Sequence, residues 1–347
     1  MKIIGCDFHS GFQQAAVFDN RSGKVEEKKL LHPSEAVEYY RGLAAAGEVA
    51  RVGMEAGVPC QWFRRLLAEC GHELWVGDAA RIRAAETRRQ KTDRRDALLM
   101  LKLLREGNFP RIWMPSEAER DVRQLLMDRH HRMRTRTKCK NQLQALALNQ
   151  GLQKGLKLWS VAGQQQLREL PMMEHASRRR DQLQRMVAEL DAQMAELDGI
   201  ISSEARGREE AKLLMTHPGV GPQTALAMVL TIGEVSRFAS SKHLSSYLGL
   251  IPGEYSSGNK QKLGHISKQG SPFLRFLLVE AGQSAVRGDA ELRRAYLRLG
   301  AKKSRAVAKV MVARRLAVRL YWMLREHKNY AELVRHAGKP ESSRGQQ

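Results

Sequence analysis

The sequence predicts an α/β domain at the N-terminus, long helices in the middle and a mainly α-helical C-terminal domain. Short apolar runs separated by polar turns fill the first part of the chain, which is typical of strands. From Ser116 onward, apolar residues recur every three or four positions, which indicates long helices. The formal net charge of +22 over 347 residues favours a polyanionic partner.

The predicted α/β domain spans residues 1–118. Its expected strands are residues 2–7, 13–18, 25–30, 49–54 and 73–76. Its expected helices are residues 34–45 and residues 60–70. Residues 81–85 lead into a third expected helix, which carries Asp93 and Asp96 and ends at Arg105. Three strands followed by alternating helices and strands fit a mixed sheet with helices on its faces.

The predicted middle segment, residues 119–206, is helical. Its apolar residues alternate spacings of four and three, as in a coiled-coil seam, at Leu183, Val187, Leu190, Met194, Leu197 and Ile201. Two interpretations stay open for this seam. It either packs within its own chain as a helical hairpin, or it joins two chains as a dimerising coiled coil.

The predicted C-terminal domain, residues 207–330, opens with Gly219-Val220-Gly221 between two apolar helices, a pattern similar to a helix-hairpin-helix turn. Glycines let backbone N–H groups approach a phosphate, but the same pattern also suits a simple connecting turn. A loop rich in small polar residues follows at 248–260, a very basic helix is expected over 301–325, and residues 331–347 form a polar tail.

The positive charge is concentrated in two regions. Residues 255–330 hold 17 Lys and Arg against 4 Asp and Glu, and residues 81–140 hold 18 against 8. Residues 1–55 are nearly neutral, with 7 against 8. This distribution predicts salt-dependent contacts with nucleic acid. An apolar run of about 18 residues is absent, so we expect a cytoplasmic protein with no membrane partner.

Four acidic residues predict a metal site: Asp7, Glu55, Asp93 and Asp96. The first two end apolar strands, and the other two lie three residues apart on an expected helix, hence on one face. Carboxylate oxygens are the ligands that Mg²⁺ prefers, with Mn²⁺ as an alternative. Two such ions about 4 Å apart can activate a nucleophile and stabilise the leaving group in phosphodiester cleavage.

Ser256 and Ser257 lie in the predicted polar loop, and Lys260, Lys268 and Arg275 are nearby in the sequence. A serine hydroxyl attacks a phosphate only when a base or a metal activates it. From the residues alone, these two are ordinary loop serines.

The motifs together resemble a known family. The first block is Asp7, Glu55 and the run Lys91-Thr92-Asp93-Arg94-Arg95-Asp96-Ala97. The second block is the set of segments at 218–222, 247–252, 256–258, 266–270 and 274–275. In this order, the blocks are similar to the DEDD transposases of bacterial insertion sequences, the IS110 family, which includes the Piv-type DNA invertases. The resemblance covers about residues 2–330.

This resemblance implies a RuvC-like, RNase H-type N-terminal domain whose four acids bind Mg²⁺. It also implies a nucleophilic serine, best matched by Ser257 with Ser256 in reserve, that forms a covalent phosphoserine link to DNA. A structured guide RNA is implied as a second partner, and we expect a dimer or tetramer. The residues expected to contact nucleic acid are Arg94, Arg95, Gly219, Gly221, Lys260, Lys268 and Arg275.

Two other functions remain open at this point. Besides a transposase that cuts and joins DNA strands, the alternatives are a RuvC-like, Mg²⁺-dependent junction nuclease that hydrolyses DNA with water, and an inactive relative that only binds nucleic acid. Activity that survives replacement of Ser257 favours the first alternative.

Overall fold

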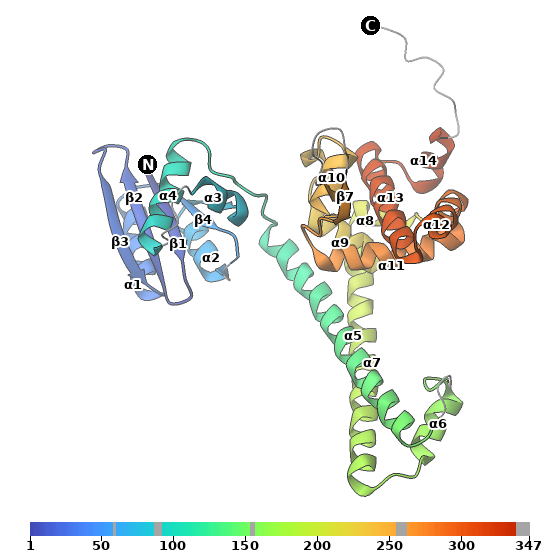
Figure 1. Ribbon diagram of the computed structural model, residues 1–347. Coiled ribbons are helices and arrows are strands. Elements are labelled where there is room, and N and C mark those ends of the chain that lie inside the picture. The colour runs from blue at the N-terminus through green and yellow to red at the C-terminus, as the bar shows by residue number, and fades with distance from the viewer. Residues whose placement is uncertain (58–59, 87–91, 153–156, 255–261, 338–347) are drawn as a thin grey trace, which may run out of the picture. The chain divides into compact units, whose positions relative to one another are not determined.

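The computed structural model describes residues 1–57, 60–86, 92–152, 157–254 and 262–337. The chain forms two compact units, Met1–Met114 and Pro115–Gln347, which are treated separately below (Figure 1). Among the described helices, none combines the length and apolar character needed to cross a membrane.

The first unit is built on one five-stranded mixed sheet. Strands β2 and β3 run antiparallel to their neighbours, whereas β1, β4 and β5 are parallel, in the order β3-β2-β1-β4-β5. The strands are β1 (Lys2–Phe8), β2 (Phe12–Asp19), β3 (Val25–Leu31), β4 (Ala50–Glu55) and β5 (Glu73–Gly77). The helices are α1 (Ser34–Ala45), α2 (Gln61–Glu69), α3 (Ala79–Ala85) and α4 (Asp93–Arg105). The expected mixed α/β domain is confirmed, and its RNase H-type assignment stays a prediction.

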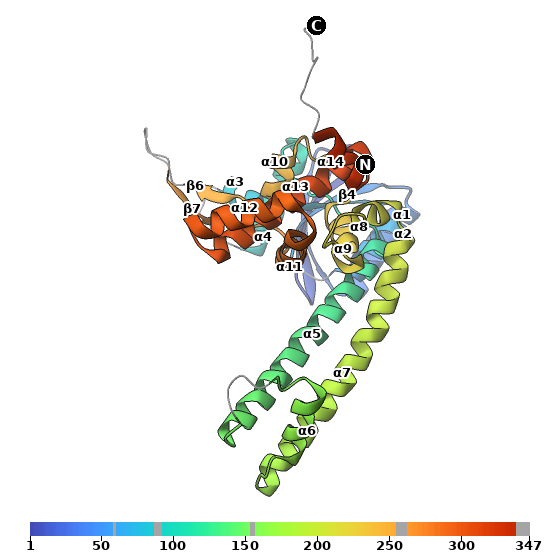
Figure 2. The same ribbon diagram turned by 90° about the vertical axis from the view of Figure 1, so that its right-hand side faces the viewer.

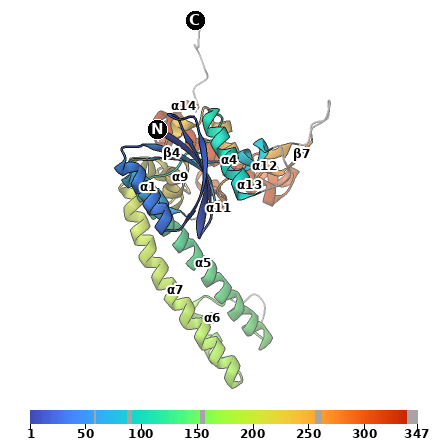
Figure 3. The same cartoon turned by 90° about the vertical axis from the view of Figure 1, so that its left-hand side faces the viewer.

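Helices cover both faces of this sheet, as Figure 3 shows for α1 and α4. On one face, Ile4, Cys6 and Phe8 of β1 pack into a core with α1 and α2. On the other face, α4 lies directly against β1. A Cβ atom on Gly5 would come within 2.1 Å of the Ala97 carbonyl oxygen, so this position needs the smallest residue. Odd-numbered residues of β1 therefore face α4.

The second unit begins with an antiparallel pair of long helices, α5 (Glu117–Asn149) and α7 (Glu174–Arg206), which lie side by side with the short α6 (Val161–Glu169) near their far end (Figures 1 and 2). Leu183 and Val187 of the predicted seam are buried with Cys139 and Leu143 of α5. The seam therefore packs within the chain as a helical hairpin.

The remaining helices pack around one large apolar core. They are α8 (Glu209–Met215), α9 (Pro222–Ile232), the 3₁₀ turn η1 (Val235–Arg237), α10 (Ser241–Tyr247), α11 (Pro272–Gly288), α12 (Ala290–Lys302), α13 (Arg305–Glu326) and α14 (Tyr330–Ala337). The mainly helical C-terminal region is confirmed. The predicted polar tail begins with a helix, α14.

A short antiparallel hairpin replaces part of the expected loop. Its strands are β6 (Pro252–Glu254) and β7 (Leu263–Ile266). The sequence showed no alternating apolar pattern here, because strands this short bury little and are held mainly by backbone hydrogen bonds.

Candidate metal centre and nucleic-acid-binding residues

The carboxylates of Asp7 and Glu55 lie on the same face and at the same edge of the sheet. Strands β1 and β4 are parallel, with Cys6 paired to Met54, so the next residue of each strand is one of the two acids. Side chains alternate along a strand. Gly5 and Gly53 face α4, and each acid lies two residues beyond one of these glycines. Both acids therefore lie on the face that α4 covers.

The N-terminus of α4 supplies the other two acids. Thr92 caps the helix by accepting a hydrogen bond from the Arg95 backbone N–H, and Asp93 and Asp96 fall in the first turn. Negative side chains are stabilised there by the helix dipole. The sequence thus places an N-cap and two acids at the start of α4. Packing of α4 against β1 brings this end of the helix beside Asp7.

The centre of the site is a group of three side chains, Asp7, His9 and Asp93. The Nε2 atom of His9 lies 3.1 Å from Asp7 Oδ2 and 3.6 Å from Asp93 Oδ2. One ligand atom from each residue lies within 4.8 Å of the others. The His9 ring also stacks on Phe12, with ring centroids 4.7 Å apart. The structure therefore brings two of the four predicted acids into direct contact with one histidine.

His9 was missed by the sequence analysis, which named only acidic residues as candidate metal ligands. A signal was present, because residues two apart in a strand face the same side, so an Asp-Phe-His sequence directs both polar side chains one way. The signal is weak because residue 9 follows the last residue of β1, where alternation no longer has to hold.

The electrostatics at Asp7 reflect crowded negative charge. Burial raises the pKa of the Asp7 carboxyl above its ordinary value, contact with His9 opposes this, and the charges of Asp96 and Asp93 raise the pKa further. Repulsion among neighbouring carboxylates is what a bound cation relieves. Asp96 therefore acts on the site through its charge, although it is not among the three residues in contact.

Glu55 has a different partner. Its Oε1 atom lies 3.8 Å from a guanidinium nitrogen of Arg83 on α3, and both side chains are well exposed. An exposed pair of this kind contributes about 0–1 kcal/mol, so it holds Glu55 only weakly. Glu55 shares its face of the sheet with Asp7 but is not part of the three-residue group.

The donor set fits a divalent cation. Carboxylate oxygens suit Mg²⁺ and Mn²⁺ alike, whereas an imidazole nitrogen suits transition metals better than Mg²⁺. The side chains of Asp7 and Asp93 reach one point from a rigid strand and a capped helix. In such a site, Asp7 and Asp93 would hold the ion, and His9 would serve as a ligand or as a hydrogen-bond partner.

The predicted basic nucleic-acid-binding residues differ in their surroundings. Arg94 is exposed and pairs with Glu27 of β3, whose carboxylate accepts a hydrogen bond from an Arg94 guanidinium nitrogen at 2.7 Å. Arg95 lies in the first turn of α4, and Lys268 is exposed. Arg275 donates to the carbonyl oxygens of Leu248 and Gln269 and so ties α11 to the preceding segment. Lys260, Ser256 and Ser257 lie outside the described residues.

The two glycines of the predicted turn have different surroundings. Gly219 has a positive φ of 84°, and a Cβ there would lie 2.4 Å from the Ala285 backbone nitrogen, so packing against α11 accounts for this glycine. Gly221 is the N-cap of α9, and a Cβ there would have no neighbour within 4 Å. Gly221 thus has the open surroundings that a phosphate approach needs.

The base of the β6–β7 hairpin is closely packed. A Cβ on Gly249 would lie 2.2 Å from the Gln269 carbonyl oxygen, and a Cβ on Gly270 would lie 2.2 Å from the Tyr247 carbonyl oxygen. Both glycines have positive φ. Together with the Arg275 hydrogen bonds, these contacts anchor both ends of the segment that carries Ser256 and Ser257 in the sequence.

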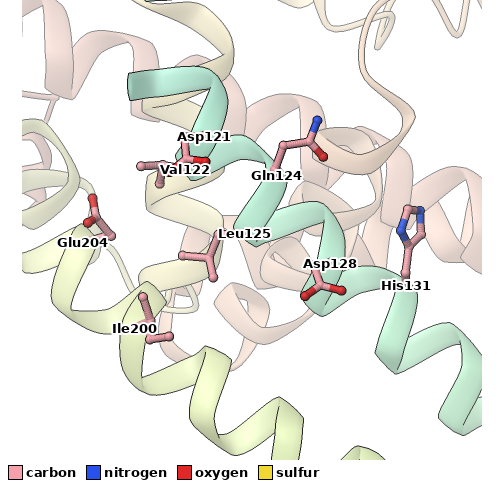
Figure 4. Close-up of a pocket in the computed structure, with 8 residues that line it drawn as sticks. All are labelled: Asp121, Val122, Gln124, Leu125, Asp128, His131, Ile200 and Glu204. Atoms are coloured by element: carbon pink, nitrogen blue, oxygen red, sulfur yellow. The ribbon is translucent and has the colours of Figure 1, made fainter. Parts of the chain in front are cut away.

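A separate hollow of about 550 Å³ lies between α5 and α7 (Figure 4). Its carboxylates belong to Asp121 and Asp128 of α5 and to Glu204 of α7, and Figure 4 shows them spread along the two helices. Asp128 is paired with Arg132 at 2.9 Å. Among the described residues, the three side chains close enough to hold a metal ion together are Asp7, His9 and Asp93 of the first unit.

Comparison with known proteins identifies the family. Residues 4–150 match a family model described as Transposase, of the DEDD IS110 type, and residues 211–297 match one described as Transposase IS116/IS110/IS902 family. The transposase for insertion sequence element IS1111A of Coxiella burnetii is 26% identical over 83% of this chain and 78% of its own length. The pilin gene-inverting protein of Moraxella bovis is 30% identical over 49% of this chain and 45% of its own length. With both models matched in order, the chain belongs to the IS116/IS110/IS902 family of DEDD transposases, which are enzymes that act on DNA.

Proposed function

We propose that this transposase cuts and joins DNA strands by using a divalent cation held by its carboxylates together with a covalent phosphoserine intermediate. The observation that carries the proposal is the convergence of Asp7, Asp93 and His9 at the end of β1. When bound, the cation would neutralise charge on the scissile phosphate. The chain's own contribution is to hold these ligands on the RuvC-like sheet that the family resemblance implies.

In the covalent step, the Ser257 Oγ–phosphorus bond forms as the bond from phosphorus to the 3′ oxygen breaks. The serine gives up its proton, and the leaving 3′ oxygen takes one up and becomes a free hydroxyl. That hydroxyl can attack the phosphoserine of a second strand and restore a phosphodiester without an external energy source. Serine is the matching nucleophile because it forms a phosphate ester of comparable energy.

The positive charge supports a second macromolecular partner. Residues 255–330 hold 17 basic against 4 acidic side chains, more than is needed for solubility. We propose that this surface binds the backbone of a structured guide RNA as well as DNA, since base pairing would then select the sequence. We also propose that a dimer or tetramer carries out strand exchange, because two DNA sites must be held at once.

Covalent trapping tests the chemistry. The full-length protein is expressed with its flanking element DNA, incubated with Mg²⁺ and run on a denaturing gel. We expect a protein–DNA adduct with wild type and none with Ser257→Ala or Asp7→Asn. Ser256→Ala is the matched control and should retain the adduct. Nicking by Ser257→Ala without any wild-type adduct would refute the phosphoserine step and favour a water-using nuclease.

Two treatments separate the metal and the RNA from the serine. Chelation of divalent cations should abolish the adduct, and added Mg²⁺ or Mn²⁺ should restore it. Ribonuclease treatment before DNA is added should prevent adduct formation if a guide RNA selects the site. An adduct that forms at the same rate after ribonuclease treatment would refute the RNA part alone.

A further inference from the structure

A second feature of the C-terminal unit has the composition of a nucleobase-binding pocket. It is a cavity of about 230 Å³ between α5, α9, α10 and the start of α11. The residues that line it are Arg123, Leu126, Met127, Ala227, Thr231, Tyr247, Ser271 and Phe273. We call this cavity the Tyr247–Phe273 pocket. Its volume is below the roughly 300–1,000 Å³ of pockets for drug-sized ligands, so it suits a single ring system.

Further aromatic side chains contact the rings that line this pocket. The Phe273 ring lies 4.9 Å from the ring of His130, which in turn lies 5.3 Å from Phe276. The Tyr247 ring packs on buried Phe238 at 5.2 Å. Tyr247 and Phe276 are each 39% exposed. Partly exposed aromatic rings of this kind are what the bases of a single strand stack on.

Arginines lie among these rings. Arg123 lines the pocket, and its guanidinium donates to the Leu230 carbonyl oxygen, which fixes its position. The Arg237 guanidinium lies 5.2 Å from the Phe238 ring and 5.7 Å from the Tyr247 ring. Positive charges fixed beside aromatic faces match a ligand that alternates flat bases with phosphates.

The position of the pocket in the chain connects it to the proposed chemistry. Tyr247 is the last residue of α10, before the β6–β7 hairpin, and Ser271 is the N-cap of α11, after the hairpin. Contacts of Gly249 and Gly270 join the two ends of that segment beside the pocket. The pocket therefore lies next to both ends of the segment that carries Ser256 and Ser257 in the sequence.

We propose that the Tyr247–Phe273 pocket binds one unstacked base of single-stranded DNA and so holds the strand beside the hairpin. The choice of DNA rests on the proposed function. Stacking on an aromatic ring tolerates every base, so we expect the pocket to select single-stranded over duplex DNA and not one sequence. Tyr247 and Phe273 act here as binding residues for the strand.

The test measures binding and not cleavage. Full-length wild type, Phe273→Leu and Tyr247→Leu are titrated in EDTA with matched single-stranded DNA, duplex DNA and single-stranded RNA. Each replacement should weaken single-stranded DNA binding by about 5- to 150-fold, the effect expected for one lost stacking interaction, and should leave duplex binding within about twofold. Leu is chosen because Phe273 also packs against the core, so an apolar side chain preserves the fold.

Trp322→Leu is the matched control. Trp322 is an aromatic residue of α13 with 41% exposure, and it is not among the residues that line the pocket. This variant should bind all three nucleic acids like wild type. Equal losses for single-stranded and duplex DNA, a loss confined to RNA, or no loss would each overturn the proposal. The wild-type adduct is scored separately, so failure of the pocket and failure of the serine chemistry give different results.

Discussion

Replacing Gly5 with alanine should damage both the stability of the first unit and its metal site. The added Cβ would lie 2.1 Å from the Ala97 carbonyl oxygen and 2.4 Å from the Leu101 nitrogen, both backbone atoms of α4. Real Cβ contacts start at 3.0 Å, so α4 must move away from β1 by nearly 1 Å. Overpacking of this kind costs about 1–3 kcal/mol, and we expect the upper end because backbone cannot rotate aside.

The same displacement would carry Asp93 away from Asp7. Ligand oxygens must lie about 2.0–2.1 Å from Mg²⁺, so a shift approaching 1 Å is large for the site. We expect Gly5→Ala to bind Mn²⁺ roughly 10-fold more weakly or worse, as measured by calorimetric titration. The loss of stability is measured by thermal denaturation followed by circular dichroism.

Gly42→Ala is the matched control. Gly42 lies within α1, and a Cβ there would have no neighbour within 4 Å. Alanine in a helix interior should stabilise the protein by about 0.5–1 kcal/mol and leave Mn²⁺ binding unchanged. If Gly5→Ala matches wild type in both measurements, the close packing of α4 on β1 does not position Asp93.

Two further predictions concern the second unit. Burial lowers the pKa of His217 from 6.5 to about 4. As the pH falls, the unfolded chain therefore takes up a proton on this histidine before the folded chain does. The contribution of neutral His217 to the free energy of unfolding is complete above pH 6.5 and is lost as the pH falls towards 4. We expect wild type to lose about 3 kcal/mol more than His217→Phe between pH 7 and pH 4 in urea denaturation, and parallel pH profiles would contradict this assignment. The buried Asp289 carboxylate pairs with Arg319 and also accepts a hydrogen bond from Tyr330 at 2.6 Å. Arg319→Met should destabilise the protein by about 3–5 kcal/mol, because it leaves this buried carboxylate without its cation. Asp289→Asn combined with Arg319→Met should recover part of that stability, and strict additivity of the two changes would refute the pairing.

Much of the fold follows from local patterns in the sequence. The expected strands and helices of the first unit lie close to those observed, because alternation and helical spacing are imposed by which face is buried. The β6–β7 hairpin and the separate helix α12 were not expected. The hairpin strands are too short to show a pattern, and α12 lies within a stretch so basic that its apolar face, which includes Leu292 and Ala295, is inconspicuous.

The proximity of two candidate ligands was predicted from the sequence. Asp7 and Asp93 lie together, since a strand end and a capped helix start are both readable in the sequence. The metal-binding role of Asp7, Glu55, Asp93 and Asp96 stays a prediction. His9 was missed, because its role depends on contacts with both acids and with Phe12, which only folding creates. The functional assignment of Ser257 and Lys260 stays a prediction, as does that of Arg94, Arg95, Gly221, Lys268 and Arg275.

The sequence by itself determined which side chains this protein has for chemistry and packing: four acids in a family pattern, a large positive charge and a heptad seam. The tertiary structure decided how these are used. The heptad seam of α7 packs against α5 of the same chain. Two helices of one chain are always at high effective concentration relative to each other, which favours this pairing. The tertiary structure also assigned Gly219 to packing against α11 and placed His9 between two carboxylates. Such outcomes depend on contacts between residues distant in sequence, which no local pattern encodes.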